Sequence, residues 1–513
     1  MRSHLRKSVI GAITAAAVVL APIAFASPAD AHGSKDSVRQ LVKAVSGKNV
    51  KKHLWALQAI AKLNDDTRVS GTRGFDLSRD YVAYLLRRAG YDVTIQPFEF
   101  TFDGYITPPV FKRTSGTQKT YTYGFFSDYV AMQDSPAGAV SGTLQAVDLV
   151  LPPGPVANSS SSGCEAADFA GFTAGNIALM QRGTCSFRIK VDNAIAAGAS
   201  AAVVFNEGQE GRTEIDLNPT LGGPGVTIPS FFTSFAVGNE LAATAGTTVQ
   251  MNWDPIVETR TTYNVIAQSR KGNPDNVVML GAHLDSVQEG PGINDNGSGT
   301  AGILEVALQM ARSKPKNQMR FAFWGAEEFG LLGSQHYVNA LTPEERAKIT
   351  LYLNFDMIAS PNYTFGIYDG DGDAFGTAGP PGSDVIEEDF EKFFANRGQP
   401  FTATAFTGRS DYGPFIAVGI PSGGLFTGAE VLKTEEEAAI FGGTAGIPLD
   451  PCYHSVCDTI RNVNDKALDV NSDAIATLAG TYAFNTGTIG TTPPAPASRT
   501  TDTHTHKPAD SAS

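Results

Sequence analysis

The N-terminal third of the chain alternates between a helical and a strand-like spacing of hydrophobic positions. Residues 51–63 and 78–89 carry apolar side chains every three to four positions, which predicts two amphipathic helices. Gly90 follows the second of them and is a typical helix terminator. Residues 91–96 alternate polar and apolar side chains, as a strand does. We therefore expect helix, turn, helix and strand over residues 32–100.

The pattern changes between about residues 105 and 258. Charged residues become sparse there, Gly, Ser, Thr and Pro become frequent, and the hydrophobic runs are short and β-branched. The expected elements are strands at 142–151, 176–180, 201–206 and 226–232 and a helix at 186–199. This composition predicts a small β-rich α+β domain over residues 111–257.

Buried strands and helices alternate again from residue 262 onward. The expected strands are 277–280, 320–324 and 350–355, and the expected helices are 302–311 and 333–340. Such alternation is typical of an α/β fold with a mostly parallel central sheet flanked by helices. We assign this domain to residues 32–110 and 258–490, interrupted by the β-rich insertion.

Both ends of the sequence differ from these domains. Arg2, Arg6 and Lys7 precede an apolar run over residues 9–20, and Ala29-Asp30-Ala31 has the spacing of a signal-peptidase site. We expect a signal peptide over residues 1–31, with cleavage after Ala26 as the alternative. A membrane anchor is disfavoured because the run is too short to cross a bilayer.

Residues 491–513 consist mainly of Thr, Pro, Ala, Ser and His without periodicity, which predicts a disordered tail. The mature protein is expected to be secreted and extracellular, to have no membrane association and to be a monomer.

Length and charge narrow the class of protein further. At 513 residues the chain exceeds what one hydrophobic core serves, and 42% hydrophobic with 18% charged residues fits a folded protein. The net charge of -13 would repel a phosphate backbone, so a nucleic-acid partner is excluded.

The sequence contains four cysteines, which a secreted protein would oxidise to disulfides. Four cysteines allow three pairings. The simplest joins Cys164 to Cys185 and Cys452 to Cys457, because each pair then lies within one domain.

Histidines and acidic residues follow the expected strands of the α/β domain. They are His283, Asp295, Glu327, Glu328, Asp356 and, further along, His454. In an open α/β sheet, ligands bind at the edge where the carboxyl ends of the parallel strands lie. Several carboxylates cannot all ionise close together without a cation, and imidazole with carboxylate suits zinc. Five ligands with one bridging carboxylate would hold two zinc ions, whereas solvated loop acids are the alternative.

Five motifs in order resemble the co-catalytic zinc aminopeptidases of the bacterial leucyl aminopeptidase and aminopeptidase Y group. They are His283-x-Asp285, Asn294-Asp295-Asn296-Gly297, Glu327-Glu328, Asn354-Phe355-Asp356-Met357 and Tyr453-His454, and the resemblance covers residues 48–100 and 262–485. It implies the zinc exopeptidase fold and two zinc ions. One zinc would be held by His283 and Asp356, the other by Glu328 and His454, and Asp295 would bridge them.

The same resemblance assigns roles around the metals. It implies that Glu327 is the general base and that Asp285 orients the ligand His283. Tyr453 would stabilise the oxyanion, with ordinary packing as the alternative. Arg409 matches a position near the substrate, where the alternative is a surface salt bridge. Met357 and Phe426 match positions that line an apolar specificity pocket, and either could instead belong to the core.

Some members of this group also bind calcium. Asp469 and Asp473 match part of that site, but Ala44 falls roughly where an acidic residue is expected. The resemblance therefore supports a calcium site only in part.

The insertion resembles a protease-associated (PA) domain. The matching stretch begins at Gly175-Asn176-Ile177-Ala178-Leu179-Met180-Gln181-Arg182-Gly183 and includes Cys185-Ser186-Phe187. We find no catalytic grouping in it and expect a lid or docking unit.

The function we expect is removal of a large apolar N-terminal residue, such as Leu, Met or Phe, from peptides or proteins. A zinc-activated water would attack, with Glu327 as base. Related enzymes act as carboxypeptidases, but those carry an extra helical dimerisation domain, and only a tail follows residue 485. Binding proteins on the same scaffold lack zinc ligands, whereas all five residues are present here.

Overall fold

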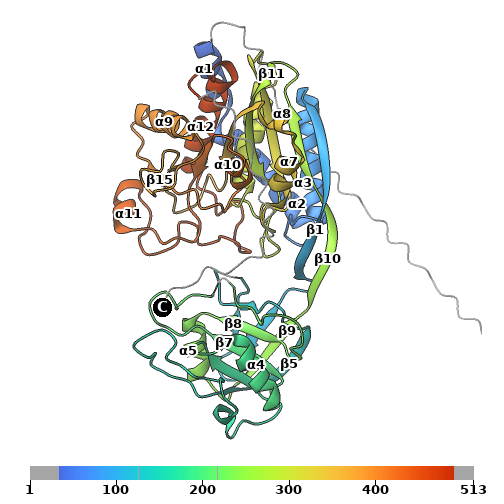
Figure 1. Cartoon of the computed structure of the whole chain (residues 1–513), viewed down its shortest axis with the longest axis vertical. Coiled ribbons are helices and arrows are strands. Elements are labelled where there is room, and N and C mark those ends of the chain that lie inside the picture. Colours follow the sequence, from blue (N-terminus) through green and yellow to red (C-terminus); the bar gives the residue numbers. More distant parts are fainter. Residues whose placement is uncertain (1–33, 125, 217, 490–513) are drawn as a thin grey trace, which may run out of the picture.

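Two β-sheets organise the chain, one above the other in Figure 1. The computed structural model describes residues 34–124, 126–216 and 218–489. The expected signal peptide (1–31) and tail (491–513) lie outside these ranges. Within them, no helix has the length and apolar character needed to cross a membrane.

The first sheet carries the predicted α/β domain. Its strands lie in the order β1 (Asp92–Tyr105), β10 (Pro255–Gln268), β12 (Asn317–Trp324), β11 (Asn273–His283), β13 (Ile349–Phe355), β16 (Ser422–Phe426), β14 (Gly366–Tyr368) and β15 (Thr402–Thr404). The central strands β12, β11, β13 and β16 are parallel to one another. Antiparallel pairs join β1, β10 and β12 on one side and β16 to β14 on the other. The mostly parallel α/β sheet predicted for this domain is thus confirmed.

Helices cover both faces of this sheet. One face packs against α1 (Ser34–Ala44), α2 (Gly47–Lys62), α3 (Arg73–Ala89), α6 (Gly297–Met310), α9 (Ser383–Asn396) and α12 (Asp465–Phe484), and the other packs against α7 (Leu332–Ala340) and α10 (Gly413–Ala417). The period of two along β11 explains this division, because Val278 and Leu280 enter the first core while Val277 and Met279 enter the second. The short helices α8 (Pro343–Arg346) and α11 (Glu435–Phe441) complete the domain.

The N-terminal segment differs from its prediction in one element. It holds three helices rather than two, since α1 precedes α2, and the side chain of Ser46 caps α2 by accepting a hydrogen bond from Asn49 N. Helix α3 ends at Gly90, whose φ of 99° suits glycine. Strand β1 continues to Tyr105, well past the predicted residue 96, because it pairs with β10 along its whole length.

The second sheet forms the inserted unit. Its order is β3 (Lys119–Tyr121), β2 (Val110–Arg113), β9 (Thr248–Trp253), β5 (Gly138–Ala146), β6 (Ile177–Gln181), β7 (Ala201–Phe205), β8 (Ser230–Thr233) and β4 (Tyr129–Ala131). The 3-10 helix η1 (Ala166–Phe169) and helices α4 (Phe187–Ala196) and α5 (Phe235–Ala243) pack on it. The predicted Cys164–Cys185 disulfide is present in this unit.

Strands β1 and β10 form the connection between the two units, as a long antiparallel ribbon (Figure 1). At its far end Tyr105 pairs with Pro255. Gln288 from the α/β domain holds this end, since its Oε1 accepts Tyr105 N at 3.1 Å and its Nε2 donates to Tyr105 O at 2.7 Å. The insertion therefore starts from a fixed point beside the α/β domain.

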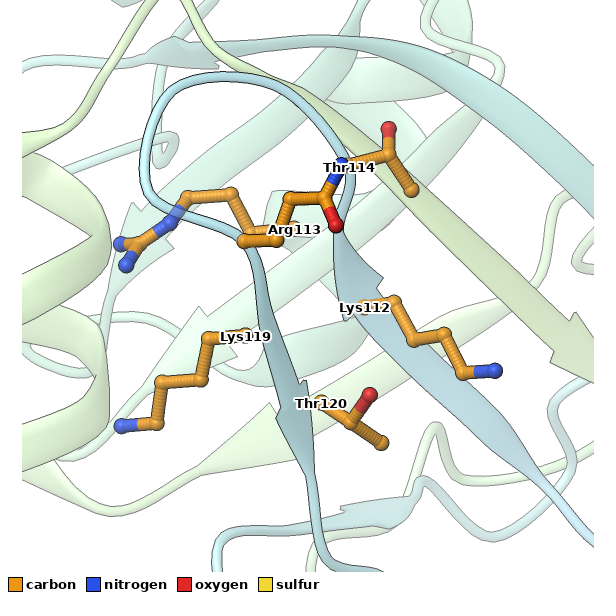
Figure 2. Close-up of a pocket in the computed structure, with 6 residues that line it drawn as sticks. Lys112, Arg113, Thr114, Lys119 and Thr120 are labelled. Atoms are coloured by element: carbon orange, nitrogen blue, oxygen red, sulfur yellow. The ribbon is translucent and has the colours of Figure 1, made fainter.

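A hollow in the insertion lies at the β2–β3 hairpin, where Lys112, Arg113 and Lys119 gather (Figure 2). Arg113 Nη1 lies 3.0 Å from Glu240 Oε1, and Lys119 Nζ lies 2.5 Å from Glu240 Oε2. Two of its three cations are thus neutralised by one carboxylate, and none of the predicted site residues line it.

Candidate active site

The candidate site lies at the carboxyl edge of the central parallel strands. His283 is the last residue of β11, Glu327 and Glu328 follow β12, and Asp356 follows β13 directly. Asp295 lies in the loop before α6, whose cap residue Asn296 accepts a hydrogen bond from Gly299 N. The alignment of parallel strand ends thus brings together residues that are far apart in the sequence.

Asp295 is the centre of the cluster. Its Oδ1 lies 3.2 Å from His283 Nε2, and its Oδ2 lies 3.1 Å from His454 Nε2. His283 Nε2 is also 3.4 Å from Asp356 Oδ1, while His454 Nε2 is 3.1 Å from Glu328 Oε2. The five predicted ligands therefore form two groups, and one carboxylate is shared between them.

Burial and mutual charge shift the pKa values of this cluster strongly. Burial lowers the pKa of His283 and of His454, but neighbouring carboxylates, Glu327 first for His283 and Glu328 first for His454, raise both well above the usual value. Burial raises the pKa of Glu328 to about 7. Burial also acts to raise the pKa of Asp295, yet hydrogen bonds from the two histidines hold it below its usual range. The cluster thus retains protons that a bound cation would displace.

The donor set fits zinc. Glu328 Oε1 and Asp356 Oδ1 are buried and have no hydrogen-bond partner among the described residues. Buried polar atoms are normally paired, so these two oxygens indicate a missing electrophile. Imidazole nitrogen with carboxylate oxygen is the ligand combination that zinc prefers over calcium or magnesium.

Glu327 lies beside this cluster rather than apart from it. Its Oε2 is 3.9 Å from His283 Nε2, and its carboxylate groups with His283 and Asp356 closely enough to share a cation. Burial raises the pKa of Glu327 well above its usual value. The contacts alone do not separate a base from a ligand, so that distinction rests on the motif.

Asp285 was expected to orient His283 through its carboxylate. Its Oδ1 lies 3.7 Å from His283 Nδ1, which is too long for a hydrogen bond, whereas the Asp285 carbonyl oxygen lies 3.2 Å from the same nitrogen. The carboxylate instead accepts a hydrogen bond from Glu327 N at 3.3 Å. Asp285 thus contacts both His283 and Glu327.

Two buried residues that the sequence analysis did not identify hold the loop between His283 and Asp295. Arg68 is fully buried, and its guanidinium donates to the carbonyls of Leu284, Pro291 and Gly292. Asp458 accepts from Asn294 N at 2.8 Å and from Asp295 N at 3.0 Å. A guanidinium on carbonyls and a carboxyl on amides therefore fix the loop that carries Asp295 from both sides.

A network of hydrogen-bonded side chains supports Asp356. Ser410 Oγ donates to Asp356 Oδ2 at 2.6 Å, and Asn354 Nδ2 donates to Ser410 Oγ at 2.8 Å. Tyr352 OH in turn donates to Asn354 Oδ1, and Trp324 Nε1 donates to Tyr352 OH, so the network reaches the core of the sheet. Ser410 directly follows Arg409 in the sequence, and that proximity was the one signal that could have pointed to it.

The loop that carries His454 is closed by the predicted disulfide between Cys452 and Cys457. Within it, the rings of Tyr453 and His454 lie 3.9 Å apart. Burial, together with Asp295 and Glu328, raises the pKa of Tyr453 well above its usual value, so its hydroxyl keeps its proton. Arg409 Nη2 lies 3.5 Å from that hydroxyl, and Arg409 Nη1 pairs with Glu430 at 2.6 Å.

The remaining predicted residues lie in several places. Met357 is buried next to Asp356, and Phe426 at the end of β16 is partly buried against the core that Tyr352 and Phe415 share. Asp469 accepts a hydrogen bond from Gly47 N, near Ala44. Asp473 forms an ion pair with Arg397 at 2.9 Å.

Comparison with known proteins agrees with this geometry. Residues 264–479 match the family described as Peptidase family M28, and residues 146–241 match the PA domain. An "Aminopeptidase" of Pseudomonas aeruginosa (strain UCBPP-PA14) is 47% identical over 453 residues, which cover 88% of this chain and 83% of the relative. A "Probable leucine aminopeptidase 2" of Aspergillus fumigatus is 44% identical over 452 residues, 85% of each chain.

Solved structures show the same fold. The aminopeptidase from Aneurinibacillus sp. strain AM-1 has a TM-score of 0.54 at 26% identity, with 87% of this chain and 95% of that chain covered. BSAP, a zinc aminopeptidase from Bacillus subtilis, has a TM-score of 0.57 at 24% identity, covering 85% and 94%. With the ligand motifs in place and a curated relative this similar over most of its length, the chain belongs to the aminopeptidases of peptidase family M28, with a PA domain inserted.

Proposed function

We propose that the protein is a secreted aminopeptidase that uses two zinc ions to remove large apolar residues from peptide N-termini. The observation that carries this proposal is Asp295, whose two oxygens face His283 and His454 at 3.2 and 3.1 Å. Asp356 completes one group and Glu328 completes the other. A carboxylate shared in this way is the arrangement that a two-metal hydrolase needs.

Zinc at this site supplies Lewis-acid polarisation of the scissile carbonyl and lowers the pKa of a water molecule. The chain supplies the proton transfers. Glu327 takes the proton of the attacking water and passes it to the leaving amine, because its carboxylate lies beside the proposed ligands His283 and Asp356. The contact between Glu327 N and the Asp285 carboxylate holds the Glu327 backbone in place.

Tyr453 stabilises the oxyanion, and Arg409 lies beside its hydroxyl. Tyr453 stays protonated at neutral pH, so its hydroxyl is available as a donor. Arg409 lies at the limit of hydrogen-bond distance from the hydroxyl oxygen, which leaves the hydroxyl proton free to point at the substrate. The ion pair with Glu430 fixes the Arg409 side chain, which is otherwise largely exposed.

Recognition of a free N-terminus follows from the acidic side chains of the site, which can pair with the amino group of the substrate. Glu327 and Asp356 offer carboxylates to the substrate amino group, whereas an acetylated terminus would leave buried acceptors unpaired at a cost of about 1–3 kcal/mol each. Met357 and Phe426 are expected to line the pocket for the first side chain. Burial of a leucine there contributes roughly 1.5–3 kcal/mol, which favours Leu, Met or Phe over Gly or Glu.

Secretion is supported by two features. Residues 1–31 have the charge, apolar run and small residues of a signal peptide, and the described chain contains two disulfides and no free cysteine. An oxidising compartment is where such bonds persist.

The test compares hydrolysis of Leu-, Gly- and Glu-anilides with acetyl-Leu-anilide and with a peptide whose N-terminus is blocked but whose C-terminus is free. We expect rapid cleavage of Leu-anilide alone among these substrates. Comparable cleavage of acetyl-Leu-anilide, or release of C-terminal residues from the blocked peptide, would contradict the proposal. Metal analysis of the active protein should give two zinc ions per chain.

A further inference from the structure

An aromatic side chain of the inserted PA domain, that of Phe126, reaches the candidate active site. Phe126 lies between β3 and β4, and its ring centroid is 5.1 Å from that of Tyr453 and 6.1 Å from that of His454. Phe126 is still 39% exposed, although it touches two half-buried rings of the other domain. A large apolar side chain is therefore presented at the rim of the zinc site.

The backbone on both sides of Phe126 is held by hydrogen bonds. Gly124 N donates to Tyr129 O at 2.9 Å, and Asp128 N donates to Thr122 O at 3.0 Å. The Asp128 carboxylate accepts from Thr122 N at 2.7 Å. Gly124 has a φ of 137°, and a Cβ there would lie 3.7 Å from the carbonyl oxygen of His454. This segment is thus built to approach the loop that carries the zinc ligand.

Aromatic packing fixes the base of the same segment to the interdomain ribbon. Tyr123 stacks on Trp253 with ring centroids 6.0 Å apart, and it meets Tyr105 edge to face at 5.8 Å. Tyr105 ends β1, and Trp253 ends β9 just before β10. The position of Phe126 is therefore set by the point where the insertion joins the peptidase domain.

We propose that Phe126 is a specificity-determining residue that contacts the substrate residue following the scissile bond. This inference rests on the proposed aminopeptidase function. Met357, just after β13, and Phe426, at the end of β16, are assigned to the first substrate residue. The Phe126 ring lies against Tyr453 but comes from the other domain, outside the pocket assigned to the first residue. We therefore place it next to the part of the peptide that follows the scissile bond. Its exposed face selects for an apolar or aromatic side chain at that second position.

The test uses Phe126→Ala with leucinamide, Leu-Gly-amide and Leu-Phe-amide as substrates. Aromatic pairs stabilise by an amount equivalent to about a three- to ten-fold change in affinity. We expect kcat/KM for Leu-Phe-amide to fall by that factor, mainly through KM, while leucinamide hydrolysis and zinc content stay unchanged. Phe126→Tyr keeps the ring and should restore the preference.

The matched control is Ile189→Ala, which truncates another exposed apolar side chain of the insertion, on α4. It should alter none of the three substrates. An equal loss on all three substrates for Phe126→Ala, a loss of zinc, or no change at all would overturn the inference. A wild-type protein that cleaves none of the three substrates would instead refute the proposed function, which the Phe126 variants do not affect.

Discussion

Three residues in or next to the candidate zinc cluster adopt a left-handed backbone conformation, which residues other than glycine rarely take. Ala326 has a φ of 52°, Met357 of 46° and His454 of 51°. Each left-handed residue costs roughly 1–2 kcal/mol. Hydrogen bonds offset that cost, for example from Ala326 N to Ser70 Oγ at 2.7 Å and from Met357 N to Asn296 Oδ1 at 3.2 Å. The chain thus bends sharply where adjacent residues such as Glu327 and Asp356 must meet.

Adjacent glutamates should behave differently when each is made neutral. Glu327→Gln should keep both zinc ions while kcat falls by at least the roughly 10²–10⁴-fold that a general base contributes. Glu328→Gln should lower the zinc content, because Glu328 lies 3.1 Å from His454 and has an unpaired oxygen. Metal analysis and steady-state kinetics on both variants separate the roles. Identical metal content and identical activity would contradict the assignment.

Arg68 should matter for stability more than any exposed arginine. Arg68→Met leaves three carbonyls of the 284–292 loop without their donor, and each buried unsatisfied group costs about 1–3 kcal/mol. We expect a lower free energy of unfolding in urea and weaker zinc binding. Arg87→Met, on the exposed side of α3, is the control and should change stability by less than about 0.5 kcal/mol.

At the scale of elements, Glu387 on α9 meets two acids of the turn between β14 and α9, Asp369 and Asp371. Glu387 Oε2 accepts Gly370 N at 2.7 Å and Asp371 N at 3.2 Å. Burial, followed by the charges of Asp371 and Asp369, raises the pKa of Glu387 from 4.5 to about 7. Helix α9 therefore carries a carboxyl against this turn that keeps its proton to a higher pH than an exposed glutamate does.

This pKa shift predicts how stability changes with pH. The folded pKa lies above the unfolded one, so the contribution of Glu387 is fully present below about pH 4.5 and is lost as the pH rises through about 7. Glu387→Gln should raise the melting temperature by a few degrees at pH 8 and hardly at pH 5. Glu388→Gln, at an exposed neighbouring position, should show no such difference. An equal effect of Glu387→Gln at both pH values would contradict the assignment.

The elements also show what a sequence can and cannot predict. The strands that end at His283, Glu327 and Asp356 were predictable, because each joins a buried apolar run to a polar motif. Arg68 was not, since a lone arginine in a helical N-terminal segment gives no sign of the loop it binds more than two hundred residues later. Nor was Phe126, whose contact depends on how the insertion folds back onto the peptidase domain.

At the scale of the whole molecule, metal should link activity to stability. Removing zinc leaves Glu327, Glu328 and Asp411 as buried carboxyls with raised pKa values, close to one another and without a compensating cation. We expect a strong chelator to abolish hydrolysis and to lower the melting temperature, and zinc to restore both, since a ligand that binds only the folded state stabilises it. Full activity in protein shown by elemental analysis to be metal-free would refute zinc dependence.

The β1–β10 ribbon has a consequence for how this architecture can be gained or lost. Because Tyr105 and Pro255 are cross-strand partners, the polypeptide leaves the peptidase sheet and re-enters it at a single point. A two-residue turn can join such partners, so deleting the stretch between them would convert the ribbon into an ordinary hairpin without moving a strand. A single deletion could thus remove the PA domain and leave every predicted zinc ligand in place. The shortened enzyme would lose what the insertion contributes at the rim of the candidate site, including the contact of Phe126 with Tyr453.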